Sequence, residues 1–288
     1  MKNYFSLVKF SHTLFAMPFA LLGFFIATTE KSGGVDWLLL GLVVLCMVFA
    51  RSAAMAFNRW LDRDVDAANP RTRMREIPAG VISPRSALLF VAINCLLFVG
   101  VTYLINSICF YLSPVALAVV LGYSYTKRFT WFCHLVLGLG LALAPVGAYL
   151  AVMGHFDWIP VLYGCAVLCW TAGFDVIYAL QDEEFDQSQR LYSMPAFFGK
   201  AQALRISEWL HLGTAALMVY AGRLLHSRIP EANNLLWIGT GIFLVLLLYQ
   251  HLLVKPNDLR RVNLAFFTTN GFASLIFGML AIIDLLTG

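Results

Sequence analysis

Oxygen-bearing side chains, most of them acidic, recur at four-residue intervals in two separate parts of this 288-residue chain. Asn58, Asp62 and Asp66 form the first set, and Asp182 and Asp186 form the second. Residues four apart share one face of an α-helix, so each set would align its oxygens in a stripe. Oxygen ligands without His or Cys favour a hard cation, and Mg²⁺ is typically held by a few carboxylates together with substrate phosphates. We therefore interpret the two sets as ligands of Mg²⁺, since solvated loop acids would not need two matched stripes.

An ionisable residue stands about two helical turns before each set. Arg51 is seven residues before Asn58. Asp175 is likewise seven before Asp182, so the two sets superimpose at a single offset of 124 residues. This offset predicts a degenerate internal repeat that faces two stripes across one cavity, with Arg51 and Asp175 deeper in it.

Basic residues follow the first set and supply possible phosphate ligands. Arg71 and Arg75 are four residues apart and could clamp a diphosphate through planar, bidentate contacts. Tyr123 and Lys127 repeat the four-residue step at the end of an apolar stretch, where ordinary anchoring at a membrane interface is the alternative. Beside two acidic stripes, they favour a substrate that joins a diphosphate to a long apolar tail, such as an isoprenyl diphosphate.

The composition says what kind of protein must position these residues. Only 12% of the residues carry a formal charge, and 60% are hydrophobic. An average soluble domain is about 25% charged and about 45–50% apolar. A soluble globule is therefore excluded, and so is a disordered chain, because the apolar content is too high. Most of the surface must face lipid.

The hydropathy pattern predicts an all-α, polytopic membrane protein. A lipid-spanning helix needs about 20 mainly apolar residues. Nine stretches qualify, and the first is too long and too poor in cleavage-site features to be a signal peptide. We expect them to surround a central cavity. The predicted spans are 10–29, 36–57, 86–106, 108–126, 131–152, 158–180, 203–224, 234–254 and 262–286.

The distribution of Lys and Arg predicts the orientation. With the N-terminus inside, 17 of the 20 basic residues fall on one side and three on the other. The N-terminus and two long loops, 58–85 and 181–202, are then cytoplasmic, and these loops cap the cavity. The net charge of +4 is a topology signal and gives no indication of nucleic-acid binding. The cysteines are interpreted as buried hydrophobes and the scattered histidines mostly as interfacial residues.

Three motifs resemble those of one family of membrane enzymes. The run NRWLDRDVDAANPRTRMREIPAG, from Asn58 to Gly80, resembles the first aspartate motif of the UbiA superfamily of intramembrane prenyltransferases. The runs YSYTK, from Tyr123 to Lys127, and DVIYALQDEEFD, from Asp175 to Asp186, resemble its Tyr-x-x-x-Lys element and its second aspartate motif. The resemblance covers essentially the whole chain and implies one transmembrane prenyltransferase domain over 1–288.

The resemblance implies a Mg²⁺-dependent aromatic polyprenyltransferase. The diphosphate of a polyprenyl donor departs, and the ring of an aromatic acceptor attacks the allylic cation. The resemblance implies that the metal and the diphosphate are bound by Asn58, Asp62, Asp66, Asp182 and Asp186. The four aspartates of this set, together with Asp175, are the implied catalytic residues. The implied ligands that hold and neutralise the diphosphate are Arg71, Arg75, Tyr123 and Lys127.

The acceptor is expected on the deeper side of the cavity. Arg51 could bind an acceptor carboxylate and Asp175 could accept a phenol or ring proton, unless the two residues pair with each other. Tyr178 could line the same wall. The motifs resemble those of 4-hydroxybenzoate polyprenyltransferases in ubiquinone biosynthesis, and equally those of relatives that prenylate 1,4-dihydroxy-6-naphthoate for menaquinone. The chain departs from the family pattern at Leu191–Pro195, where a His-Ser-Ile-Pro run is more usual in the family.

A membrane transporter is the alternative from another class. Intramembrane charges and an internal repeat would suit one, but two acidic stripes at one membrane face beside Arg-rich sequence would not be explained. Within prenyl chemistry, chlorophyllide, haem or another lipid could be the acceptor. We expect an integral protein of a bacterial inner membrane, whose partners are the bilayer, the donor and the acceptor. No segment indicates a protein partner.

Overall fold

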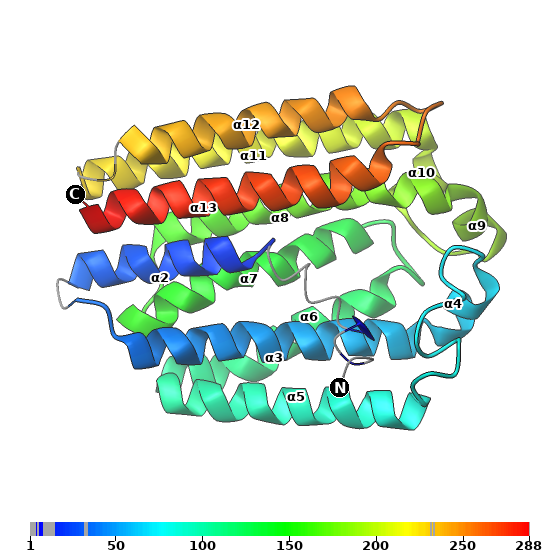
Figure 1. The fold of residues 1–288 in the computed structure, drawn as a ribbon, viewed down its shortest axis with the longest axis horizontal. Coiled ribbons are helices and arrows are strands. Elements are labelled where there is room, and N and C mark those ends of the chain that lie inside the picture. Colours follow the sequence, from blue (N-terminus) through cyan, green and yellow to red (C-terminus); the bar gives the residue numbers. More distant parts are fainter. Residues whose placement is uncertain are drawn as a thin grey trace.

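The chain folds into a bundle of long helices with three short helices gathered at one end (Figure 1). The computed structural model describes residues 4, 6–7, 15–31, 34–230, 232 and 234–287. Over these residues there is no β-strand, and only an isolated bridge joins Lys255 and Asp258. The helices are α2 (Met17–Lys31), α3 (Trp37–Leu61), α4 (Arg63–Ala68), α5 (Pro84–Ile105), α6 (Ser107–Thr126), α7 (Cys133–Met153), α8 (Trp158–Ala179), η2 (Leu180–Asp182), α9 (Glu183–Ser188), α10 (Met194–Phe198), α11 (Lys200–Arg228), α12 (Asn234–Leu253), the π-helical turn η3 (Leu264–Thr269) and α13 (Asn270–Thr287).

Seven helical segments of the described chain are long and apolar enough to cross a membrane. They are Trp37–Leu61, Pro84–Ile105, Ser107–Thr126, Cys133–Met153, Trp158–Ser188, Asn234–Leu253 and Leu264–Thr287. The all-α class and the membrane location predicted from the sequence agree with these segments. The other two predicted spans also contain helices, α2 and α11. However, α2 has only 15 residues, residues 10–14 of its predicted span lie outside the described residues, and α11 carries charges such as Arg205 and Glu208.

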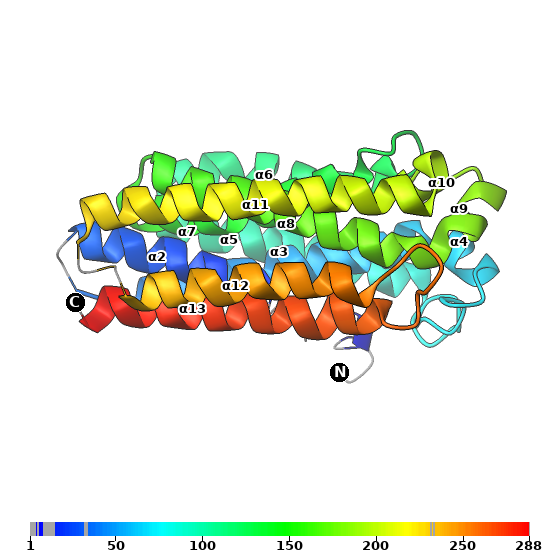
Figure 2. The ribbon, with the colours of Figure 1, turned by 90° about the horizontal axis from the view of Figure 1, so that it is seen from above.

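The long helices run side by side, and the polar connections lie together beyond one end of them (Figures 1 and 2). Helix α8 packs against α7 and α11, and α2 packs against α7 and α13. Small residues allow this close approach, as is usual between helices in a membrane. A Cβ atom on Gly138 of α7 would lie 2.4 Å from the Leu168 carbonyl oxygen of α8. Aromatic rings fill the centre, where Trp170 packs on Phe19 and Phe243 at ring-centroid distances of 5.6 and 5.4 Å.

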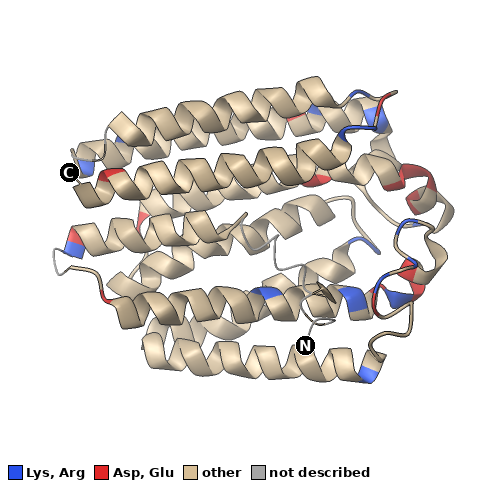
Figure 3. Cartoon of the chain, viewed as in Figure 1, with Lys and Arg blue, Asp and Glu red and all other residues tan. Residues whose placement is uncertain are grey.

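Charged residues are concentrated at the end that carries α4, α9 and α10 (Figure 3). The chain reaches this end along α3 and returns from it along α5. It reaches the same end again along α8 and returns along α11. The two acidic sets therefore come together because α3 and α8 deliver them to the same end of the bundle.

Each acidic set lies across a break in its helix rather than along one straight helix. Asp62 ends α3 and precedes the six-residue helix α4, and Asp182 holds the same place before the six-residue helix α9. Asp66 and Asp186 are the fourth residues of these short helices, and both are buried. The structural repeat therefore superimposes the sets at an offset of 120 residues. The predicted offset of 124 is wrong by one helical turn, because the four-residue spacing alone cannot show where each helix ends.

Candidate active site

A polar cavity of about 280 Å³ opens where the two helix breaks meet. Its wall includes residues from α3, α4, α6, α7 and α8 and from the loop after α4. Eleven of the twelve predicted site residues line it: Arg51, Asn58, Asp62, Asp66, Arg71, Arg75, Tyr123, Lys127, Asp175, Tyr178 and Asp182. The twelfth, Asp186, is fully buried behind the wall, where its carboxylate contacts the Lys127 ammonium.

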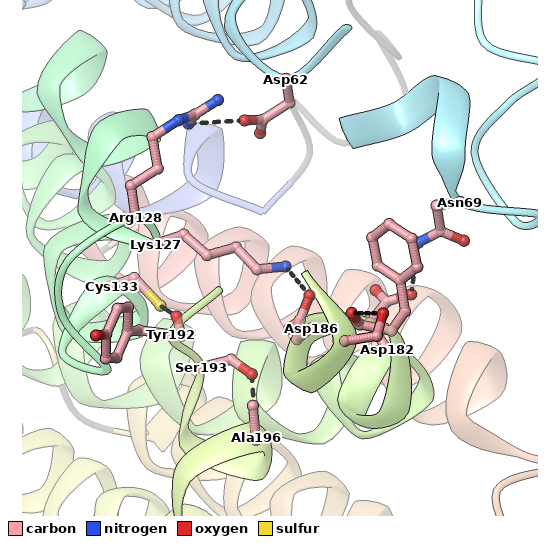
Figure 4. A network of polar contacts seen from close by, with 12 residues as sticks. Asp62, Asn69, Lys127, Arg128, Cys133, Asp182, Asp186, Tyr192, Ser193 and Ala196 are labelled. Atoms are coloured by element: carbon pink, nitrogen blue, oxygen red, sulfur yellow. Dashed lines mark hydrogen bonds and ion pairs between the residues drawn. The ribbon is translucent and has the colours of Figure 1, made fainter. Parts of the chain in front are cut away.

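The carboxylates of the first set each pair with a cation from another part of the chain. Asp62 Oδ1 lies 2.9 Å from Arg128 Nη1, an ion pair visible in Figure 4. Arg75 Nη1 donates to Asp66 Oδ1 at 2.7 Å, and the buried Arg59 lies 4.0 Å from Asp66 Oδ2. The guanidinium of Arg128 comes from the loop after α6, so the end of α3 is tied to the end of α6.

The second set is paired in the same way. The Arg71 guanidinium makes two contacts with the Asp182 carboxylate, one of them from Nε to Oδ1 at 2.9 Å. It also donates from Nη1 to Tyr178 Oη at 2.8 Å. Asn69 Nδ2 donates to Asp182 Oδ1 at 3.2 Å, and Lys127 Nζ lies 2.8 Å from Asp186 Oδ1 (Figure 4). Every carboxylate of the two sets therefore has a basic neighbour.

Arg71 and Arg75 were predicted as one clamp, but they contact opposite sides of the cavity. Arg71 contacts Asp182 of the second set, and Arg75 contacts Asp66 of the first. The predicted four-residue alignment fails because residues 70–80 form consecutive turns rather than a helix. Both guanidinium groups nevertheless face the same cavity, so both can reach an anion bound between the two sets.

For the charged groups that lie outside the membrane-spanning segments, burial and ion pairing shift the pKa in opposite directions. Burial raises the pKa of the Asp62 carboxyl, and the neighbouring Arg128 charge offsets part of that rise. Burial lowers the pKa of Lys127, but the Asp186 carboxylate outweighs it and the net pKa is raised. Arg71 behaves like Lys127, since hydrogen bonds and charge from Asp182 outweigh its burial and raise its pKa. The charged forms of this site therefore depend on one another.

The donor set suits a hard divalent cation. Asn58, Asp62, Asp66 and Asp182 line one cavity, and neither set contains a competing Cys or His ligand. Asp66 Oδ2 is buried, yet it accepts no hydrogen bond from the described residues, which is expensive for a carboxylate oxygen unless a cation completes it. Among the described residues, no three acidic, His or Cys groups converge at metal-binding distances. Arginine and lysine side chains instead take the neighbouring positions.

The deeper part of the cavity holds Arg51 and Asp175, which do not pair with each other. Asp175 Oδ2 lies 2.6 Å from Nδ1 of His134 on α7. No described carboxylate lies within ion-pair distance of Arg51, and its buried Nε has no described hydrogen-bond partner. The alternative of a structural Arg51–Asp175 pair is therefore not what the structure shows. The Arg51 guanidinium is left available to an anionic group.

An apolar cavity of about 400 Å³ adjoins the polar one. It is lined by α3, α5, α6 and α7, and its wall is almost entirely carbon. Five residues line both cavities: Arg51, Met55, Tyr123, Leu137 and Leu141. A molecule with an anionic head and a long apolar tail could therefore occupy both, with Arg51 and Tyr123 at the junction.

Sequence reasoning missed several polar residues of this site. Arg59, Asn69, Arg128 and His134 all line the polar cavity. Arg128 directly follows Lys127, so a second cation at that helix end was a visible signal. His134 is one of the scattered histidines to which the sequence spacing assigns no role in the site, yet it is only 3% exposed and bonded to Asp175.

Comparisons with known proteins agree with this fold. The model of the UbiA prenyltransferase family matches residues 16–276. The 4-hydroxybenzoate octaprenyltransferase of Tolumonas auensis is 32% identical over 247 residues, which cover 85% of this chain and 84% of that one. That of Thiobacillus denitrificans is 29% identical over 248 residues, covering 86% and 83%.

Solved structures show the same architecture. A UbiA homologue from Aeropyrum pernix K1 is 29% identical, with a TM-score of 0.84 over 95% of this chain and 98% of that one. A homologue from Archaeoglobus fulgidus, solved with DMAPP and Mg²⁺, shares the fold at 22% identity and a TM-score of 0.77, covering 99% and 100%. This chain is thus an integral membrane protein of the prenyltransferase class. It belongs to the UbiA prenyltransferase family.

Proposed function

We propose that this protein transfers a polyprenyl group from a polyprenyl diphosphate to 4-hydroxybenzoate, releasing diphosphate, as a step in ubiquinone biosynthesis. The observation that carries this proposal is the junction of the two cavities. A polar cavity with carboxylates and cations meets an apolar cavity of about 400 Å³. Arg51, which has no ion-pair partner among the described residues, lies where the two meet. The 4-hydroxybenzoate octaprenyltransferases that resemble this chain over most of its length support the same reaction.

The donor would bind with its diphosphate in the polar cavity. Asn58, Asp62, Asp66 and Asp182 would hold Mg²⁺, and Asp186, which lies behind the wall, would hold Lys127 in place rather than contact the metal as predicted from the sequence. When bound, Mg²⁺ would neutralise charge on the diphosphate and on the leaving group. Arg71, Arg75, Tyr123 and Lys127 would contact the diphosphate oxygens directly. Arg71, Arg75 and Lys127 are already held in the site by ion pairs with carboxylates. Little reorganisation of these cations is therefore needed as the negative charge moves onto the leaving group.

The apolar cavity would take the prenyl chain and keep water from the allylic cation. Its lining exposes few polar atoms, so a water molecule there would find few hydrogen-bond partners. Excluding water matters because hydrolysis competes with capture by the aromatic ring. The depth of this cavity would also limit the length of chain that fits.

The acceptor would lie at the junction with its carboxylate on Arg51. Asp175, on the facing helix, would accept the proton that the acceptor loses. Tyr178 is uncharged and would form part of the wall beside the acceptor. Its hydroxyl accepts a hydrogen bond from Arg71, and its ring stacks on Phe266 at a ring-centroid distance of 4.2 Å. The same arrangement suits a carboxylated naphthol, so 1,4-dihydroxy-6-naphthoate, for menaquinone biosynthesis, is the second candidate acceptor.

The topology completes the proposal. The chain would act as a single domain, with α2 and α11 joining the seven apolar segments to make nine spans. The excess of Lys and Arg at the end that carries the site would place that end, its cap loops and the N-terminus in the cytoplasm of a bacterial inner membrane. Soluble 4-hydroxybenzoate would then reach the site from the cytoplasm and the donor from the bilayer.

The experiment is a transfer assay in membranes that contain this protein. We expect prenylated 4-hydroxybenzoate, identified by mass spectrometry, when polyprenyl diphosphate and Mg²⁺ are supplied and none when the metal is chelated. Running 1,4-dihydroxy-6-naphthoate in parallel separates the two acceptors by their kcat/KM values. Efficient turnover of the naphthoate with none of 4-hydroxybenzoate would overturn the proposed acceptor and indicate a role in menaquinone biosynthesis instead. Turnover of neither would refute it.

A further inference from the structure

His134 joins Asp175, the deep acid of the site, to the segment 191–194, of which Leu191 and Ser193 line the same cavity. The imidazole is buried at the start of α7. On one side, its Nδ1 lies 2.6 Å from Asp175 Oδ2. On the other side, its Nε2 accepts the backbone N–H of Met194 at 3.2 Å. Both ring nitrogens are therefore used, and each contacts a different element.

These two contacts determine the tautomer of the ring. A backbone N–H can only donate, so Nε2 must offer its lone pair and carry no proton. The single ring proton is then on Nδ1 and is donated to Asp175. One carboxylate oxygen of Asp175 is fixed by this bond. The other, Oδ1, receives no hydrogen bond from the described residues, and the side chain is 23% exposed toward the cavity.

The segment bound to Nε2 is also tied to the diphosphate side of the site. The Tyr192 N–H donates to the Lys127 carbonyl oxygen at 2.7 Å, and the Leu191 N–H donates to the Asp186 carbonyl oxygen at 2.8 Å. Ser193 then caps α10 by accepting from the Ala196 N–H, as Figure 4 shows. The backbone segment that donates to His134 is therefore itself held by Lys127 and Asp186 of the donor site.

We propose that His134 is a positioning residue that aims Asp175 Oδ1 at the acceptor. This inference rests on the proposed function. In the reaction, the C–O bond of the prenyl diphosphate breaks and its electron pair leaves with the diphosphate. A ring carbon of the acceptor forms the new C–C bond and the acceptor loses one proton, which passes to Asp175 Oδ1. His134 takes no proton in this step, and it acts by holding the carboxylate in one orientation.

The competing role for His134 is to hold the 191–194 segment alone, and two substitutions separate the roles. Asparagine can place its amide nitrogen where Nδ1 stands, so His134→Asn can keep the bond to Asp175 while losing the one to Met194. Glutamine can place its amide oxygen where Nε2 stands, so His134→Gln can keep the bond to Met194 while losing the one to Asp175. We expect His134→Asn to keep most of the wild-type kcat, and His134→Gln to lose about 10²-fold, as for a misaligned general base. The KM for the prenyl diphosphate should stay within a few fold in both variants.

A double-mutant cycle gives the decisive readout. If His134 acts through Asp175, His134→Ala should lower kcat strongly in the wild type and hardly at all in Asp175→Ala. A purely structural role would cost activity in both backgrounds. Additive losses in the cycle, or a His134→Gln variant as active as wild type, would overturn the proposal. Melting temperatures in detergent identify any variant that fails to fold. If His134→Ala or His134→Gln fails, the test uses His134→Asn, which loses the bond to Met194 and should still keep most of the wild-type kcat. Wild-type turnover on 4-hydroxybenzoate is measured beside the cycle, so that failure of the proposed function is seen separately.

Discussion

Arg71, which follows the first acidic set in the chain, makes its ion pair with Asp182 of the second set. Its Nε donates to Asp182 Oδ1 at 2.9 Å, and its Nη1 donates to Tyr178 on α8. The two halves of the cavity are therefore joined by a cation before any substrate binds. This cation faces the space where an anion would bind, so the same side chain can hold the two halves together and contact the donor.

Replacing Arg71 should therefore weaken donor use strongly. We expect Arg71→Ala to lower kcat/KM for the prenyl diphosphate by about 10- to 100-fold, since a hydrogen bond to a charged group contributes about 1.5–3 kcal/mol. Arg71→Lys should recover little, because an ammonium cannot reproduce the bidentate contact. Arg73, two residues away and exposed, is the matched control, and Arg73→Ala should behave as wild type. Equal losses at both positions would show that only net charge matters.

Arg51 should matter most for acceptors that carry a carboxylate. Its guanidinium has no described carboxylate partner and lies at the junction of the two cavities. Exchanging 4-hydroxybenzoate for phenol should lower kcat/KM about 10- to 100-fold in the wild type, by loss of one charged pair. The same exchange should have little effect in Arg51→Ala. If phenol is disfavoured equally in both proteins, Arg51 does not bind the acceptor carboxylate.

Metal and diphosphate should stabilise the folded protein together. A ligand that binds only the folded state contributes about 2.7 kcal/mol at a hundredfold excess over its Kd. We expect Mg²⁺ with inorganic diphosphate to raise the melting temperature more than either alone, because the carboxylates and the arginines then gain separate partners. Asp182→Asn should abolish that increment, whereas Glu184→Gln, at an exposed position of α9, should keep it. An increment that survives Asp182→Asn would place the ions elsewhere.

The close contact of α7 with α8 can be tested away from the site. A Cβ at Gly138 would lie 2.4 Å from the Leu168 carbonyl oxygen, so Gly138→Ala must separate the helices. Overpacking of this kind costs about 1–3 kcal/mol and should lower the melting temperature in detergent. Gly147 lies on the same helix with open space around its Cβ position, so Gly147→Ala should not lower it. Equal melting temperatures for the two variants would contradict the packing described.

Much of this architecture can be read from spacing and composition, and the limits are physical. Apolar stretches predict membrane helices because lipid selects for them. The four-residue steps predict that Asp62 and Asp182 face one cavity, which they do. What the spacing cannot show is that both helices break at these residues, because a break depends on tertiary contacts. Nor can it show that Arg128 would pair with Asp62, or His134 with Asp175, since those partners come from other helices and meet only in the folded bundle.

The central claim is that the two acidic sets act together on a prenyl diphosphate, and a paired substitution in one assay tests it most directly. Transfer of a polyprenyl group to 4-hydroxybenzoate in the presence of Mg²⁺ is measured for Asp62→Ala and Asp182→Ala. The matched controls are Asp64→Ala and Glu184→Ala, whose side chains stand beside the same sets but point to solvent. We predict that each site variant loses at least about 10²-fold in kcat, as when a preorganised charge is removed, while the controls stay near wild type. Full activity in Asp62→Ala or Asp182→Ala would contradict the account.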